Sequence, residues 1–247
     1  MLIKQDLEDI EVVLLDIEGT ICPISFVKNT LFPYAIRALP QVLKQKWDDS
    51  AFTPYRDAFP EEYRSSPEAL QAHVEDLTRR DVKVAYLKNL QGYLWQSGYE
   101  SRAYNTPLFP DVLPQLRKWC EAGLACSIYS SGSVFAQRLL FEHIKDDSSS
   151  DPKAIVDERK LIRAWFDTTN AGPKTETASY SKIAGRVQVR PYKVLFLSDN
   201  VREVQAALDI GMKSIVVDRP DNALLTEEEQ TEYDVVASLE EIKLPRG

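Results

Sequence analysis

Four short apolar segments constrain this chain more than any other feature of its sequence. Residues 12–15, 124–129, 194–197 and 214–217 are rich in β-branched residues, and each is followed by polar residues. Such brief, continuous apolar runs are typical of strands buried on both faces of a parallel sheet. Helix-like segments follow at 112–122, 134–143 and 201–210, the last with Asn200 as the expected N-cap and Gly211 as the expected stop. The alternation predicts an α/β fold.

The alternation breaks between residues 25 and 104, where we find three helix-like segments and no convincing strand. One segment begins at Pro67, directly after Ser66 as a candidate N-cap. Another carries the apolar stripe Val84, Leu87, Leu90 and Leu94. We therefore predict a core of residues 1–24 and 105–247, with a helical domain of residues 25–104 inserted after the first strand.

Charge and cysteine content limit the partners and the compartment. The 247 residues include 30 Lys and Arg against 38 Asp and Glu, a net charge of −8. Nucleic acid and anionic membranes are bound mainly by clustered positive charge, so we expect neither as a partner. Cys22, Cys120 and Cys126 lack C-x-x-C spacing, which predicts reduced thiols in the cytoplasm. We find no signal segment, no membrane span and no heptad seam, and expect a monomer.

The polar residues after the first strand are the strongest candidates for catalysis. Asp16 ends that strand, and Glu18 follows two residues later, before Gly19. A glycine permits a sharp turn that can return the second carboxyl group to the same site. Such a pair suits a nucleophile with a separate general acid or base. The alternative is that Asp16 caps the following turn and Glu18 is solvated.

Two further segments could bind an anion at the same edge of the sheet. Ser130 and Ser131 follow the second strand and precede a helix, so their hydroxyls and free backbone N–H groups would form a neutral cradle suited to phosphate. The alternative is an ordinary capped loop. Lys174 lies just before a helical segment and could face either water or a cluster of carboxylates and phosphate.

Asp199 ends another buried strand, in the segment Ser198-Asp199-Asn200. The carboxylates of Asp16 and Asp199 could therefore supply oxygen ligands to one Mg²⁺, a hard cation that also accepts water and substrate phosphate. Glu203 lies one helical turn further and could support this arrangement.

Together these motifs resemble those of the haloacid dehalogenase-like phosphohydrolases, which carry D-x-D-G-T, a strand-end Ser or Thr, a Lys and an acidic strand end. The corresponding segments here are Asp16 to Thr20, Ser130, Lys174 and Ser198 to Asn200. Two departures, Glu18 for the second Asp and S-D-N for a paired acid, are similar to the enolase-phosphatase E1 branch. Two longer segments are similar to the same branch: D-I-E-G-T-I-C-P-I-S-F-V at residues 16–27 and Y-S-S-G-S at residues 129–133. The resemblance implies a Rossmann-like core with an inserted helical cap of the C1 type.

The resemblance also implies a bifunctional enzyme of methionine salvage. It would convert the diketone 2,3-diketo-5-methylthiopentyl 1-phosphate to the acireductone 1,2-dihydroxy-3-keto-5-methylthiopentene and phosphate, in the cytoplasm and also in the nucleus. Asp16 would attack phosphorus, and Glu18 would act as acid and base. One Mg²⁺ per chain would be held by the carboxylates of Asp16 and Asp199 and the backbone carbonyl of Glu18. The implied substrate-binding residues are Ser130, Ser131 and Lys174.

Other functions fit the same motifs. A general Mg²⁺-dependent small-molecule phosphatase of this superfamily would act without enolisation. A non-catalytic signalling module would instead accumulate a phosphorylated Asp16. A dehalogenase fits less well, because displacement at carbon has no use for Mg²⁺. The acidic, serine-rich segment at residues 146–152 predicts a surface loop, with a regulatory phosphorylation site as the alternative.

Overall fold

The structure is a computed structural model that describes residues 3–244. The chain forms two compact units, one of Met1–Ile24 with Thr106–Gly247 and one of Ser25–Asn105. No helix among the described residues is long and apolar enough to cross a membrane.

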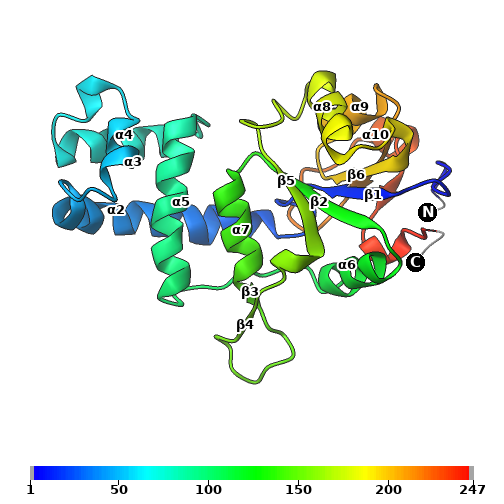
Figure 1. Ribbon diagram of the computed structural model, residues 1–247, viewed down its shortest axis with the longest axis horizontal. Helices are drawn as coiled ribbons and strands as arrows, with labels where there is room; N and C mark the ends of the chain where they lie inside the picture. The colour runs from blue at the N-terminus through cyan, green and yellow to red at the C-terminus, as the bar shows by residue number, and fades with distance from the viewer. Residues whose placement is uncertain (1–2, 245–247) are drawn as a thin grey trace. The chain divides into compact units, whose positions relative to one another are not determined.

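A six-stranded sheet forms the centre of the first unit, in the order β5-β2-β1-β6-β7-β8 (Figure 1). All of its pairings are parallel. The strands are β1 (Val12–Leu15), β2 (Ala125–Tyr129), β5 (Ile162–Phe166), β6 (Val194–Ser198), β7 (Lys213–Val217) and β8 (Val235–Val236). The predicted α/β fold with a parallel sheet is confirmed. The pattern did not predict β5, in which Arg163 is exposed, or the two-residue β8.

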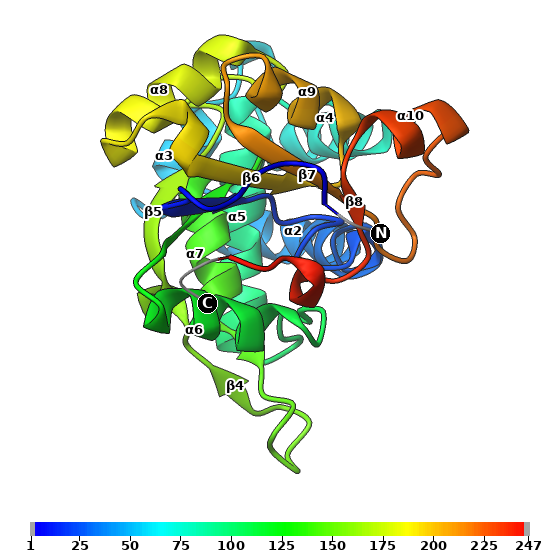
Figure 2. The same cartoon turned by 90° about the vertical axis from the view of Figure 1, so that its right-hand side faces the viewer.

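Helices cover both faces of this sheet. In both views α8 (Thr177–Val187) and α9 (Val201–Leu208) lie on one face, and α6 (Val112–Glu121) and α7 (Val134–Glu142) on the other (Figures 1 and 2). The unit is completed by α10 (Glu227–Glu232) and by 3₁₀ turns at Arg159–Leu161, Pro191–Lys193 and Leu239–Glu241. The predicted N-cap of α9 is confirmed, since the Asn200 side chain accepts a hydrogen bond from the backbone N–H of Arg202 at 3.0 Å.

Burial fixes the two central strands. Leu14, Leu15 and Leu197 are fully buried, and Phe196 packs in one cluster with Leu14 and Tyr180 of α8. Each such side chain contributes about 1.5–3 kcal/mol by leaving water. The central strands therefore hold the polar residues at their carboxyl ends in fixed positions.

A short hairpin extends from this unit. It pairs β3 (Ile144–Lys145) with β4 (Ile155–Val156), and the predicted surface loop lies between them and protrudes (Figure 2). Asp146 orders the start of the loop by accepting hydrogen bonds from the backbone N–H and the hydroxyl of Ser148, at 3.0 and 2.6 Å.

The second unit is helical throughout. It contains α1 (Ile24–Phe26, beginning one residue before the unit), a π-helical turn (Val27–Leu31), α2 (Phe32–Lys46), α3 (Thr53–Asp57), a 3₁₀ turn (Glu61–Tyr63), α4 (Pro67–Arg79) and α5 (Ala85–Glu100). Ser66 caps α4 as predicted, accepting from the backbone N–H of Ala69 at 3.2 Å. Leu90 and Leu94 of the predicted stripe are buried in a core of their own with Leu39 of α2. This unit thus buries apolar surface independently of the sheet.

Candidate active site

The strand order brings three predicted site residues to one edge of the sheet. β1 lies between β2 and β6, so Asp16, Ser130 and Asp199 follow three neighbouring strands at their carboxyl ends. Asp16 is 4% exposed and donates its backbone N–H to the carbonyl of Leu197 at 2.9 Å, which continues the ladder between β1 and β6. Ligands of open parallel sheets bind at this edge.

A tight turn follows β1 and carries Glu18. The carbonyl of Ile17 accepts hydrogen bonds from three consecutive N–H groups, those of residues 20–22, and Gly19 has φ +76°. A Cβ built on Gly19 would lie 2.6 Å from Oδ2 of Asp199. Glycine is therefore needed both for the backbone conformation and for space, and the Asp199 carboxylate packs directly on the turn.

Lys174 faces the carboxylates of the site and not water, which is one of the two directions that its sequence context allowed. Its Nζ lies 2.6 Å from Oδ1 of Asp16 and 2.6 Å from Oε2 of Glu203, and its side chain is 6% exposed. Burial disfavours the charged form, but Asp16 and Glu203 outweigh it, so the pKa of Lys174 is raised. An ammonium group has three donors, and two meet these carboxylates, which leaves one for a further acceptor.

The ionised forms of the two strand-end aspartates, Asp16 and Asp199, are disfavoured unless a cation lies close to them. Burial raises the pKa of Asp16 well above its ordinary value, against the opposing effect of Lys174, and Glu203, Glu18 and Asp199 raise it further. Burial likewise raises the pKa of Asp199 to about 6, again against Lys174. Buried carboxylates close to one another create a demand for positive charge at this edge.

Glu18 and Ser130 contact each other across the site. The Ser130 hydroxyl donates to Oε2 of Glu18 at 3.1 Å and accepts from the backbone N–H of Gly132 at 3.1 Å. Ser130 is fully buried, and the neighbouring Ser131 is partly buried. The second carboxyl group therefore does return over the edge of the sheet.

The start of α7 is less open to an anion than its sequence suggested. The backbone N–H of Val134 donates to Oδ2 of Asp167 at 3.0 Å, and that of Ala136 donates to the Ser133 hydroxyl at 3.3 Å. The expectation of free N–H groups is wrong at these two positions, because side chains already satisfy them.

The donor set at the edge suits a hard divalent cation. Among the described residues, no group donates a hydrogen bond to the backbone carbonyl of Glu18, whereas Gly19, Thr20, Ile21 and Cys22 each have a donor on theirs. No three His, Cys, Asp or Glu side chains within residues 3–244 form a group that could hold a metal. A cation here would therefore take two carboxylates, a carbonyl and water, which is the oxygen-rich set that Mg²⁺ prefers.

The sequence interpretation missed two residues that bear on this site and understated a third. Asn222 and Arg219, in the loop after β7, donate to the carbonyls of Gly19 and Thr20 at 2.9 and 3.1 Å. Arg219 carried a signal in the sequence, since it lies two residues after the buried strand β7, whereas Asn222 lies five residues after it and carried none. Glu203 contacts Lys174 directly and accepts from the Ser198 hydroxyl at 2.8 Å.

Comparison with known proteins places the chain in a family. Residues 10–211 match the family model of haloacid dehalogenase-like hydrolases. The enolase-phosphatase E1 of Pyricularia oryzae is 56% identical over 94% of this chain and 98% of its own length. That of Neurospora crassa is 56% identical, over 94% and 97%. The chain belongs to the enolase-phosphatase E1 family of haloacid dehalogenase-like hydrolases. It is therefore a hydrolase, and the resemblance of its motifs is confirmed.

A solved structure resembles this chain over nearly its whole length. The UTR4 protein of Saccharomyces cerevisiae has a TM-score of 0.82 and 39% identity, and the match covers 94% of this chain and 99% of that one. The likeness extends over both the sheet unit and the helical unit, because nearly the whole chain is matched. The E1 family assignment thus rests on the sequence relatives, and the fold is that of a known structure.

Proposed function

We propose that this chain is an enolase-phosphatase, which converts 2,3-diketo-5-methylthiopentyl 1-phosphate to acireductone and phosphate. The observation that carries the proposal is the pairing of Asp16 with Lys174 at 2.6 Å, directly beside a turn that carries a second carboxyl group. Family membership supports the substrate, because the curated relatives are named for both reactions.

Mg²⁺ fits the site as its cofactor, one ion per chain. Asp16 and Asp199 would hold it through their carboxylates and Glu18 through its backbone carbonyl, which accepts no hydrogen bond from the described part of the chain. When bound, Mg²⁺ would neutralise charge on the phosphoryl oxygens and polarise the carbonyl next to the reacting carbon. The raised pKa values of Asp16 and Asp199 support a cation at this point.

Asp16 acts as the nucleophile of the phosphatase step. One of its carboxylate oxygens bonds to phosphorus while the bond from phosphorus to the substrate's enol oxygen breaks, leaving an aspartyl-phosphate. Lys174 favours the ionised form of Asp16 and turns its remaining N–H toward the phosphoryl oxygens, so that it stabilises the negative charge of the transition state. Water then attacks phosphorus and releases Asp16.

Glu18 acts as the base of the enolase step. The carbon that carries the phosphate ester lies next to a carbonyl, so its proton is acidic enough for a carboxylate to remove. Glu18 takes this proton, later returns it to the departing enol oxygen, and finally activates the hydrolytic water. Its contact with Ser130 at 3.1 Å orients the carboxyl group toward the edge of the sheet.

The family resemblance supports the other parts of the proposal. Ser130, Ser131 and Lys174 bind the substrate phosphate and its neighbouring oxygens, and the helical unit Ser25–Asn105 serves as the cap. The protein acts as a monomer in the cytoplasm and also in the nucleus, on this small-molecule substrate and without nucleic acid or membrane.

Phosphate release and acireductone formation, measured together, test this function. Wild type with the diketone phosphate and Mg²⁺ should release phosphate and produce the ultraviolet absorbance of the enediol. Asp16→Asn should lose both signals, because the amide is not a nucleophile. Lys182→Met, at an exposed position of α8, is the control and should keep both.

Two outcomes would contradict the proposal. Phosphate release without the enediol, with equal rates on simple esters, would instead support a general phosphatase of the same superfamily. A phosphorylated Asp16 that lasts for minutes without turnover would support a signalling module.

A further inference from the structure

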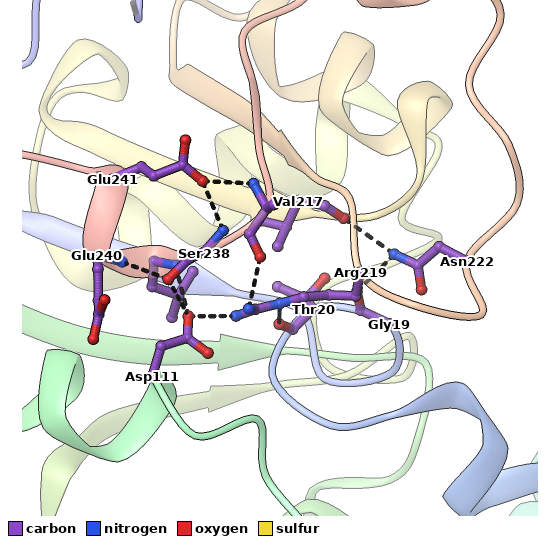
Figure 3. A network of polar contacts seen from close by, with 11 residues as sticks. Gly19, Thr20, Asp111, Val217, Arg219, Asn222, Ser238, Glu240 and Glu241 are labelled. Carbon is purple, nitrogen blue, oxygen red and sulfur yellow. Dashed lines mark hydrogen bonds and ion pairs between the residues drawn. The ribbon is translucent and has the colours of Figure 1, made fainter. Parts of the chain in front are cut away.

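The loop after β7, residues 218–226, reaches back to the turn that carries Glu18 (Figure 3). Arg219 is its most buried side chain, at 4% exposure. It donates to the carbonyl of Thr20 at 3.1 Å, to that of Ala237 at 2.8 Å and to Oδ2 of Asp111 at 2.8 Å. Its guanidinium also lies over the ring of Phe109, 4.5 Å from the centroid. Arg219 is thus held on several sides and can act as a fixed anchor.

Asn222 forms the second link between this loop and the turn. Its side-chain amide donates to the carbonyl of Gly19 at 2.9 Å and to the carbonyl of Val217, at the end of β7, at 3.1 Å (Figure 3). One amide group thereby joins the turn to the end of β7. A Cβ built on Gly19 would lie 2.8 Å from Oδ1 of Asn222, so this side chain also packs tightly on the turn.

Beside these two links, the carbonyl of Glu18 in the same turn has no hydrogen-bond donor among residues 3–244. The N–H of Gly19 donates to the carbonyl of Cys22 at 2.8 Å. In a trans peptide the N–H and C=O groups point in opposite directions, so the carbonyl of Glu18 points away from the inside of the turn. The next two carbonyls, of Gly19 and Thr20, are both taken by the loop after β7.

We propose that Asn222 and Arg219 are positioning residues of the enolase-phosphatase site, which clamp the Gly19–Thr20 backbone and so hold the Glu18 carbonyl and the Asp199 carboxylate in place. This inference rests on the proposed function. It assigns to the loop after β7 a role that the four family motifs do not include. The clamp contacts neither reacting atoms nor phosphate, and acts on the site through the turn.

The effect passes through contacts at close range. Asp199 packs against Gly19 and Asn222 packs against the same residue, so loss of the Asn222 amide frees the Gly19 carbonyl and opens space beside Asp199. A displacement of about 1 Å at a catalytic centre can cost about a hundredfold in rate. Ser130 and Ser131, the proposed substrate-binding residues, lie after β2 and outside this turn, although Ser130 contacts Glu18.

Asn222→Ala tests the clamp, with Leu224→Ala as the matched control because Leu224 lies in the same loop and is 97% exposed. Mg²⁺ alone is titrated by calorimetry without substrate, and kcat, KM and Tm are measured on the same samples. For Asn222→Ala we expect Mg²⁺ binding at least ~10-fold weaker and kcat lowered by ~10- to 100-fold. KM should stay within about twofold, and the control should match wild type.

Other results would overturn the clamp. A lower Tm for Asn222→Ala with unchanged Mg²⁺ binding and unchanged kcat would mean that the residue is only structural. If Asn222→Ala does not fold, Arg219→Lys, which keeps the charge beside Asp111 but cannot reproduce the donor geometry to Thr20, must show the same loss of Mg²⁺ binding. Absence of turnover in wild type would refute the proposed function, while the Mg²⁺ titration would still decide the clamp.

Discussion

Lys174 shows how a single side chain sets the charge of this site. It lies between two buried carboxylates, 2.6 Å from each, and its sequence context could not distinguish an inward from an outward direction. The fold decides this, because the loop after β5 brings Lys174 beside the end of β1. The charge of Asp16 therefore depends on a residue that lies 158 positions further along the chain.

Lys174→Met should destabilise the protein and abolish its activity. The change leaves Asp16 and Glu203 buried without their shared cation, and breaking a buried ion pair in this way costs about 3–5 kcal/mol. Urea unfolding at pH 7 measures the loss, with Lys182→Met as the exposed control. A loss below about 1 kcal/mol, the value of a surface pair, would show that Lys174 is solvated.

Asp199 should make the metal-free protein less stable as pH rises. Its folded pKa of about 6 exceeds its ordinary 3.8, so the folded state binds more protons than the unfolded state between these values. Stability is therefore lost as pH rises through this window, by at most about 3 kcal/mol. Asp199→Asn should remove the part of the slope that Asp199 contributes, measured as the difference in unfolding free energy from pH 4 to pH 7 in a chelator.

Mg²⁺ provides the matching control for this experiment. At pH 7 an excess of Mg²⁺ should restore stability to wild type but not to Asp199→Asn, because a ligand that binds only the folded state stabilises it. Equal pH slopes for the two proteins in the chelator would contradict the raised pKa of Asp199.

Glu18→Gln should abolish the enolase step while leaving the fold intact. Glutamine can still accept the hydrogen bond that Ser130 donates to Glu18 at 3.1 Å, but its amide cannot take a proton from carbon. The measurement is deuterium uptake from solvent at the carbon that bears the phosphate ester. Uptake at the wild-type rate would assign the base to another residue.

At the scale of single elements, α9 connects stability with the site. It begins two residues after Asp199, carries Glu203 in its first turn and is capped by Asn200 through the backbone N–H of Arg202. Asn200→Ala should cost about 1 kcal/mol, because that N–H loses its side-chain partner. Thermal unfolding measures this cost, with an exposed α9 change, Arg202→Ala, as the control. A cost equal to that of the control would refute the cap.

The sequence predicted the four inner strands of the sheet better than its two outermost strands, β5 and β8. β1, β2, β6 and β7 are almost wholly buried, so apolar residues predominate in them and no charged residue lies in their interiors. β5 lies at an edge and exposes Arg163, which interrupts the run. In the helical unit, α2 contains Pro40, a residue that argues against a helix interior, and packing in the apolar core outweighs it.

At the scale of the whole molecule, the candidate site combines segments that are far apart in the chain. Residue types and strand ends sufficed to select Asp16, Glu18, Ser130 and Asp199, because parallel topology brings strand ends to one edge. Asn222 could not be selected in this way. Its contact with Gly19 spans 203 residues, and only the path of the loop after β7 creates it.

Transfer of the phosphoryl group to Asp16 is the central claim, and rapid-quench mass spectrometry tests it most directly. Wild type, mixed with the diketone phosphate and Mg²⁺ and quenched in acid within milliseconds, should carry one phosphoryl group on the peptide that contains Asp16. The group should disappear as turnover ends and should never form in Asp16→Asn. A phosphoryl group on another residue, or turnover with Asp16 unmodified at every time point, would contradict the account.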